Sequence, residues 1–111
     1  MIKILKALFI AIAVSMILAT TRAGMHENVL QATARLLKDP WGLATFADAY
    51  CGFITFFVWV GYRENNGLSR IVWFILIMLF GNIAMSSYVL MKLFTLPKGA
   101  GIEALLLKPT A

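Results

Sequence analysis

Two apolar stretches decide the fold of this chain: PWGLATFADAYCGFITFFVWVGYR at residues 40–63 and IVWFILIMLFGNIAMSSYVLMKLF at residues 71–94. The first contains a single charged side chain, Asp48, before its C-terminal arginine, and the second contains none before its lysine. A bilayer core ~30 Å thick accommodates about 20 apolar residues per helix. The pattern therefore predicts two membrane-spanning helices, at about 40–63 and 69–95.

The boundaries of these helices are marked by capping and turn residues. Asp39 is suited to cap the first helix, and Pro40 fits its first position, where the missing N–H costs nothing. The segment Glu64-Asn65-Asn66-Gly67 is typical of a tight turn, which makes the two helices antiparallel. We expect Ser69 to cap the second helix. The aromatic residues expected at the two membrane interfaces are Trp41, Trp59, Tyr62 and Trp73.

An earlier apolar run predicts a further spanning helix at about 4–22. Its basic start, Lys3 and Lys6, also fits a signal peptide, but residues 21–23, Thr-Arg-Ala, are a poor cleavage site. A retained helix is favoured because small residues recur every four positions, a pattern that lets membrane helices approach closely. These small residues are Ala7, Ala11, Ser15 and Ala19.

Composition supports a single integral membrane domain over residues 1–111. Apolar residues make up 61% of the 111 residues and charged residues only 14%, too few to cover three such runs in water. The net charge of +5 comes from basic residues that flank the apolar runs, so we expect contact with lipid headgroups and no nucleic-acid binding. We expect an all-α, multi-pass protein of the cell (inner) membrane.

Residues 27–38, ENVLQATARLLK, predict a short amphipathic helix lying in the membrane interface. The alternative, an irregular loop, stays open for so short a segment. The tail, residues 98–111, reads as interfacial or loosely ordered. Orientation also stays open, because the reverse topology would place more basic residues in the cytoplasm, whereas the N-terminal lysines favour a cytoplasmic N-terminus.

The sequence resembles the domain of unknown function 1475 family, a group of plant and bacterial membrane proteins, from Asp39 onward. The resemblance rests on Pro40-Trp41, Ala44-Thr45, Asp48, Tyr50, Trp59-Val60, Glu64, Trp73, Phe80-Gly81, Tyr88 and Leu105-Leu106-Leu107-Lys108. It implies a membrane protein and brings with it no activity, cofactor or catalytic residue.

One polar layer is predicted within the membrane, centred on Asp48. Its neighbours at helical spacing are small or polar, so this face should point into the bundle. Counting helical levels from the tight turn places polar groups of the next helix opposite, with one more on the first helix. The predicted layer is Asp48, Asn82, Ser86, Tyr88 and Ser15. We expect Asp48 to hydrogen-bond at least one of Asn82, Ser86 and Tyr88.

This layer has two readings, a proton or small-solute site and a structural contact that fixes helix register. A lone His26 and a lone Cys51 do not make a metal site, and no catalytic set is recognisable. We therefore expect no enzyme activity, no cofactor and no metal. The favoured function is a non-catalytic accessory subunit or homo-oligomeric helix bundle. The alternatives are a small transport or proton-handling protein centred on Asp48, and a lipid-binding or lipid-modifying protein that uses the amphipathic segment 27–38.

Overall fold

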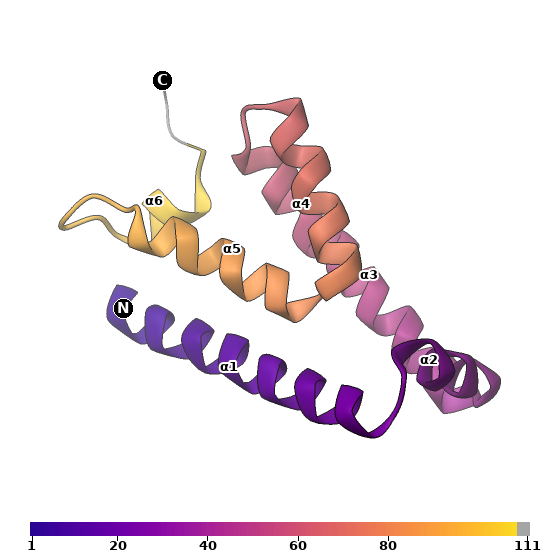
Figure 1. The fold of residues 1–111 in the computed structure, drawn as a ribbon. Coiled ribbons are helices and arrows are strands. Elements are labelled where there is room, and N and C mark those ends of the chain that lie inside the picture. The colour runs from indigo at the N-terminus through magenta and orange to yellow at the C-terminus, as the bar shows by residue number, and fades with distance from the viewer. Residues whose placement is uncertain (109–111) are drawn as a thin grey trace.

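The computed structural model describes residues 1–108, which form six α-helices (Figure 1). They are α1 (Ile2–His26), α2 (Val29–Lys38), α3 (Pro40–Arg63), α4 (Gly67–Phe80), α5 (Asn82–Phe94) and α6 (Ile102–Leu106). The all-α prediction is confirmed. The last three residues of the predicted tail, 109–111, lie outside the described residues.

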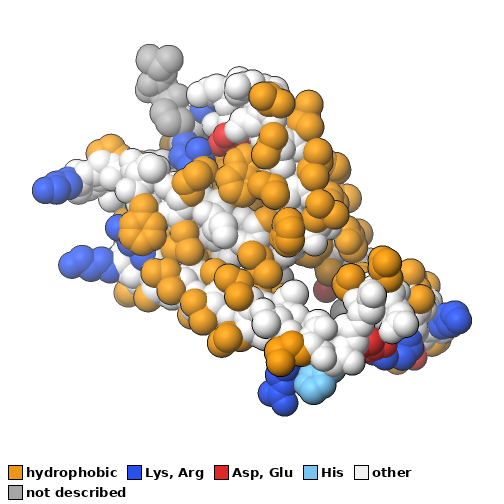
Figure 2. Space-filling model, viewed as in Figure 1, with side chains coloured by type: hydrophobic (Ala, Val, Ile, Leu, Met, Phe, Trp, Pro, Cys, Tyr) orange, Lys and Arg blue, Asp and Glu red, His pale blue; other side chains and the backbone are white. Residues whose placement is uncertain are grey.

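Among the described residues, two helices are long and apolar enough to cross a membrane, α1 with 25 residues and α3 with 24. No residue of α1 is buried, and most of its large apolar side chains are exposed. Figure 2 shows apolar side chains covering the sides of the molecule, with lysine and arginine gathered toward its ends. This distribution suits helices surrounded by lipid.

The single helix predicted at about 69–95 is not observed, and that prediction is wrong. Two shorter helices, α4 and α5, stand in its place, and Gly81 between them has φ +56° and ψ −122°. Only glycine adopts this backbone conformation readily. A Cβ at Gly81 would also lie 2.7 Å from Cζ of Phe53, so the ring of α3 occupies the space a side chain would need.

The break is compensated by hydrogen bonds. The N–H of Gly81 still donates to the carbonyl of Ile77 at 2.8 Å, which ends α4 in regular geometry. In an unbroken helix, the carbonyl of Met78 would accept from the N–H of Asn82. Here it accepts a hydrogen bond of 3.2 Å from the hydroxyl of Tyr50 on α3. A polar backbone group released by the break therefore finds a side-chain partner, as an apolar environment requires.

The break redirects α5 back toward the α3–α4 turn. A straight helix starting at Gly67 would carry Lys92 about 37 Å from the turn. Instead, Nζ of Lys92 lies 2.9 Å from the carboxylate of Glu64, within the turn itself. In this direction α5 runs antiparallel to α1, and Figure 1 shows the N-terminus beside α6 and the end of α5.

Two apolar clusters hold the helices together. The first joins α3, α4 and α5 through Val60, Ile77, Ala84 and Tyr88. The second joins the end of α5 to α6 and the start of α1; its buried members are Val89, Leu93 and Leu105, and Ile2, Leu5 and Phe9 pack against them. The start of α1 and residues 102–108, which we call the C-terminal segment, are therefore anchored at the same end of the molecule.

The short helix predicted at 27–38 is present as α2, beginning at Val29 with Asn28 as its cap. Glu27 and Arg35, two members of its predicted polar stripe, form an ion pair. The backbone of Leu36 lies over Gly42, where an added Cβ would be only 2.3 Å from the Leu36 carbonyl oxygen. Glycine thus allows α2 to fold closely against the start of α3.

The predicted start of α3 is confirmed, whereas that of the next helix is corrected. The side chain of Asp39 accepts a hydrogen bond of 2.9 Å from the N–H of Gly42, and Pro40 occupies the first turn. In α4 the cap is Asn66, whose side chain accepts from the N–H of Leu68. Ser69 instead donates a hydrogen bond to Glu64. Asn66 lies directly before the first residue of α4, so its side chain is placed to accept from the first turn, whereas Ser69 already lies inside the helix.

Candidate functional site

Polar side chains of α4 and α5 converge on the carboxylate of Glu64, the residue that caps the C-terminal end of α3. One carboxylate oxygen accepts a hydrogen bond of 2.6 Å from the hydroxyl of Ser69, at the start of α4. The other accepts 2.8 Å from the hydroxyl of Tyr88 and lies 2.9 Å from Nζ of Lys92, both on α5. We call these four residues the Glu64 cluster. The cluster holds α5, whose direction is set by the break at Gly81, against the α3–α4 turn.

The cluster keeps Glu64 ionised. Burial raises the pKa of this carboxyl, but the hydrogen bonds from Ser69, Lys92 and Tyr88, with the positive charge of Lys92, outweigh it and lower the pKa to about 2. Arg70 supports the turn from the other side, donating to the carbonyls of Gly61 at 2.9 Å and Glu64 at 2.7 Å. Carbonyls left without partners at the end of α3 are thereby satisfied.

Tyr88 reaches Glu64 from within an aromatic box. Its side chain is fully buried, and three rings meet it edge-on. The ring centroids of Trp73, Trp59 and Phe56 lie 4.8, 5.5 and 6.2 Å from that of Tyr88. Edge-to-face pairs at these distances are favourable and directional. The box therefore fixes the position of the phenol hydroxyl that donates to Glu64.

The C-terminal segment closes over the end of α3. Nε1 of Trp59 donates to the carbonyl of Leu106 at 2.9 Å, and Nη1 of Arg63 donates to that of Leu107 at 2.8 Å. The hydroxyl of Tyr62 accepts a hydrogen bond of 3.2 Å from the N–H of Lys108. Between this segment, the α3–α4 turn and the end of α5 lies a cavity of about 850 Å³. The Glu64 cluster contributes Glu64, Ser69 and Lys92 to its wall.

The predicted polar layer does not form as a unit, and the expected hydrogen bond of Asp48 is absent from the described residues. Asp48 is exposed on α3. The Ser86 hydroxyl donates to the carbonyls of Asn82 and Ile83 on its own helix, and Tyr88 bonds Glu64. The level counting assumed a straight helix through Gly81, and the break moves α5 away from Asp48.

Two members of the predicted layer do lie near each other. Ser15 of α1 and Asn82 at the start of α5 line the same shallow hollow of about 420 Å³ between these helices. Asn82 is exposed there, and its side chain forms no hydrogen bond within residues 1–108. Of the predicted layer, only Ser15 and Asn82 are therefore brought together, and the hollow they line is open rather than a closed site.

The sequence pattern does not indicate the role of Glu64, which it places in the tight turn and among the residues of the family resemblance. One signal was available in the sequence. Tyr88 and Lys92 are four residues apart and therefore share one face of a helix, so both side chains could contact the same carboxylate. What the spacing does not tell is which carboxylate that face meets. The described residues contain no group of three or more side chains suited to hold a metal ion, and Cys51 is a free, exposed thiol.

Comparison with protein families adds one decisive observation. A family model described as "Protein of unknown function (DUF1475)" matches residues 1–108, almost the whole chain. The chain belongs to the DUF1475 family. No curated protein and no solved structure matches it. Within this DUF1475 protein, four of the residues that carry the family resemblance are members of the Glu64 cluster or its aromatic box: Trp59, Glu64, Trp73 and Tyr88.

Proposed function

We propose that this DUF1475 protein is an integral membrane protein that works without catalysis, by helix association, as a homo-oligomer or as an accessory subunit. The observation that carries the proposal is the exposure of Asp48 on an otherwise apolar helix long enough to span the bilayer. A carboxylate facing lipid at such a depth costs about 2.5–3.5 kcal/mol. Cover by a partner helix that gives the carboxyl group a hydrogen bond would lower that cost.

The surroundings of Asp48 fit such a contact. The residues beside it at helical spacing are all exposed and all small or polar: Ala44, Cys51, Gly52 and Thr55. We call these five residues the Asp48 face. Small side chains allow helix backbones to approach closely in a membrane, where close packing and polar contacts drive association. A two-fold axis along the membrane normal would bring the Asp48 face opposite its copy at the same depth, so that the small residues of the two helices could meet.

Cross-linking through the native cysteine tests this association. Cys51 is the only cysteine of the chain and lies on the Asp48 face. Mild oxidation of membranes should therefore give a disulfide-linked dimer through Cys51. The matched control is Cys51→Ser combined with Ile54→Cys, because Ile54 is exposed and lies about 120° around the helix from Asp48, outside the Asp48 face. We expect at least a several-fold lower dimer yield from this control.

The remaining outcomes decide the form of the association. Asp48→Asn keeps size and hydrogen-bonding capacity and should retain the dimer, whereas Asp48→Leu should weaken it. Equal cross-linking through Cys51 and through the cysteine at position 54 would indicate random collision and would contradict the proposed homo-oligomer. A Cys51 that reacts only with a different membrane protein would instead support the accessory-subunit form.

For the membrane arrangement, we propose that α1 and α3 cross the bilayer and that α4 and α5 form a re-entrant pair, entering and leaving at the same side. Support comes from the contacts of Tyr88 and Lys92 with Glu64, at the end of α3. A third crossing by residues 69–95 would need α4 and α5 to align end to end. At 14 and 13 residues, neither is long enough alone.

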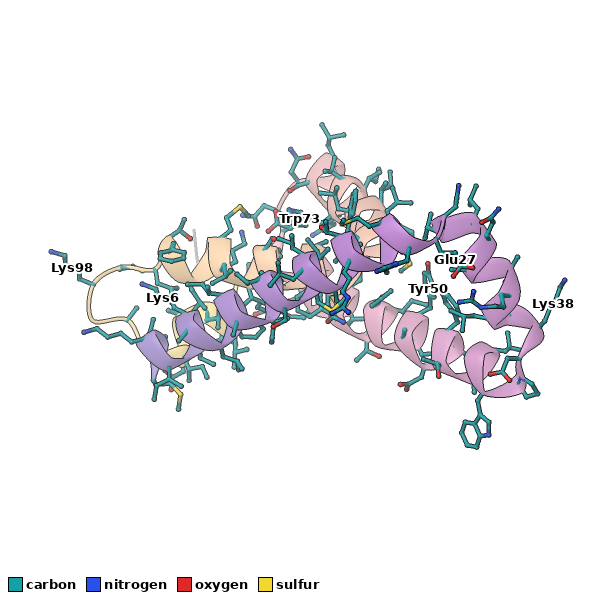
Figure 3. All side chains as sticks on the ribbon, turned by 60° about the horizontal axis from the view of Figure 1, so that its bottom comes forward. Lys6, Glu27, Lys38, Tyr50, Trp73 and Lys98 are labelled. Carbon is teal, nitrogen blue, oxygen red and sulfur yellow. The ribbon has the colours of Figure 1, made fainter. Side chains whose placement is uncertain are left out.

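Charge supports the orientation of this arrangement. Figure 3 shows Lys6 and Lys98 at one end of the molecule and Lys38 at the other. With a re-entrant pair, seven basic residues belong to the first end: Lys3, Lys6, Arg63, Arg70, Lys92, Lys98 and Lys108. Three belong to the second: Arg22, Arg35 and Lys38. Because basic residues favour the cytoplasmic side, both chain termini are expected in the cytoplasm.

Terminal tags provide the topology test. Tags fused to the N-terminus and to the C-terminus should both be protected from protease in right-side-out vesicles and cleaved after permeabilisation. A tag on the loop between α1 and α2 should be cleaved without permeabilisation. If the two terminal tags lie on opposite sides, residues 69–95 form a third crossing and the re-entrant pair is wrong.

A further inference from the structure

The cavity over the end of α3 lies outside the Asp48 face and has no role in the proposed association. It is bordered by the α3–α4 turn, by the end of α5 with the residues that follow it up to Pro97, and by the C-terminal segment. Its wall is part charged and part apolar, with Leu96, Pro97 and Leu107 among the apolar residues. At about 850 Å³ it lies within the range of small-molecule sites in proteins.

Arg63 is the most unusual residue of this wall. Only 6% of it is exposed, and it forms no ion pair within residues 1–108. Nη1 donates to the neutral carbonyl of Leu107, and the buried Nε has no hydrogen-bond partner among the described residues. A buried guanidinium is costly without a negative partner. The side chain therefore carries a positive charge for which these residues supply no counter-charge.

Neighbouring carboxylates do not supply it. Glu64 already accepts from Ser69 and Tyr88, and its charge is paired with that of Lys92. Glu103 lines the cavity but lies beyond ion-pair distance of Arg63. The cavity wall has three basic side chains, Arg63, Lys92 and Lys108, against two acidic ones. The excess positive charge includes the buried guanidinium, so an anion entering the cavity is attracted.

We propose that this cavity binds an anionic phosphate group, with Arg63 and Lys108 as its cationic contacts and the apolar wall beside it. Arginine suits this role because its planar guanidinium matches the oxygens of a phosphate. The cavity lies at the end of a helix of spanning length, the level at which lipid headgroups occur. The phosphate can therefore come from an anionic lipid headgroup or from a soluble phosphate, and the experiment separates these sources.

Native mass spectrometry of the full chain in detergent tests the site. The probes are dioctanoyl phosphatidic acid, dioctanoyl phosphatidylcholine as a lipid without net charge, and inorganic phosphate. We expect one phosphatidic acid to bind per chain, at least tenfold more tightly than phosphatidylcholine. Arg63→Gln should weaken this binding by about tenfold or more, because a charge-assisted contact is lost. Competition by inorganic phosphate indicates a soluble phosphate ligand, and its failure to compete indicates a lipid headgroup.

Two further variants keep the test decisive if Arg63→Gln does not fold. Lys108→Gln removes a charge from the cavity wall without disturbing the buried arginine, and should weaken binding several-fold. Lys98→Gln removes the same charge from an exposed side chain of the adjacent loop that does not line the cavity. It should leave binding unchanged. An equal effect of Lys98→Gln and Lys108→Gln would reduce the binding to general attraction by a basic surface, and absence of saturable binding would refute the site outright.

Discussion

Replacing Gly81 by alanine should lower the free energy of unfolding by about 2–5 kcal/mol, because strain and a clash add together. The φ of +56° and ψ of −122° at Gly81 strain any residue with a side chain. The new Cβ would also lie 2.7 Å from the ring of Phe53. Unfolding in detergent, followed by far-ultraviolet circular dichroism, measures the effect.

Gly24→Ala provides the matched control for this change. Gly24 lies within α1, and a Cβ there would have no atom within 4 Å. Alanine favours a helix over glycine, so this variant should be unchanged or more stable by up to about 1 kcal/mol. Combining Gly81→Ala with Phe53→Leu should remove the clash with the ring, whereas the backbone strain at position 81 should remain. If Gly81→Ala proves as harmless as Gly24→Ala, then residues 69–95 form one straight helix after all.

Glu64→Gln should lower the free energy of unfolding by about 3 kcal/mol, the effect of breaking a largely buried ion pair. The side chains of Glu64 and Lys92 are only 11% and 20% exposed, so the ammonium of Lys92 would remain without a counter-charge in a poorly hydrated place. The matched control is Glu27→Gln. Its partner Arg35 is 64% exposed, and exposed pairs contribute at most about 1 kcal/mol.

Lowering the pH should reduce the free energy of unfolding through the same residue, Glu64. The pKa of Glu64 is about 2 in the folded protein, against an ordinary value of 4.5. Its ionised form therefore contributes stability that is fully present above pH 4.5 and is lost as the pH falls toward 2. Unfolding measured across this range should show a steeper loss for the wild type than for Glu64→Gln. Parallel pH profiles for the two proteins would contradict the cluster.

The predictions that succeeded rest on interactions between residues close together in the chain. Asp39 and Pro40 define the start of α3 because capping needs only the next three residues. The turn after Arg63 follows from its own asparagines and glycine. The apolar helices α1 and α3 follow from uninterrupted hydrophobic runs of sufficient length.

The prediction of the candidate site depended on Gly81, whose effect on the helix cannot be read from the sequence. A glycine inside an apolar run is tolerated in membrane helices and also permits a break. The ring of Phe53, 28 residues earlier, occupies the space beside Gly81, and this contact cannot be read from residues 71–94 alone. The level counting that grouped Asp48 with Asn82, Ser86 and Tyr88 failed for this reason.

The amino-acid sequence by itself determined the helical class, the apolar helices α1 and α3, the amphipathic α2 and the tight turn after α3. Each of these depends on periodicity, capping or run length, which act over a few residues. Only the tertiary structure decided that α5 turns back at Gly81, that Tyr88 and Lys92 meet Glu64 rather than Asp48, and that Arg63 is buried beneath the C-terminal segment. These contacts join residues 24 to 44 positions apart. Their energies depend on the directions of whole helices, and a single backbone dihedral at Gly81 sets the direction of α5.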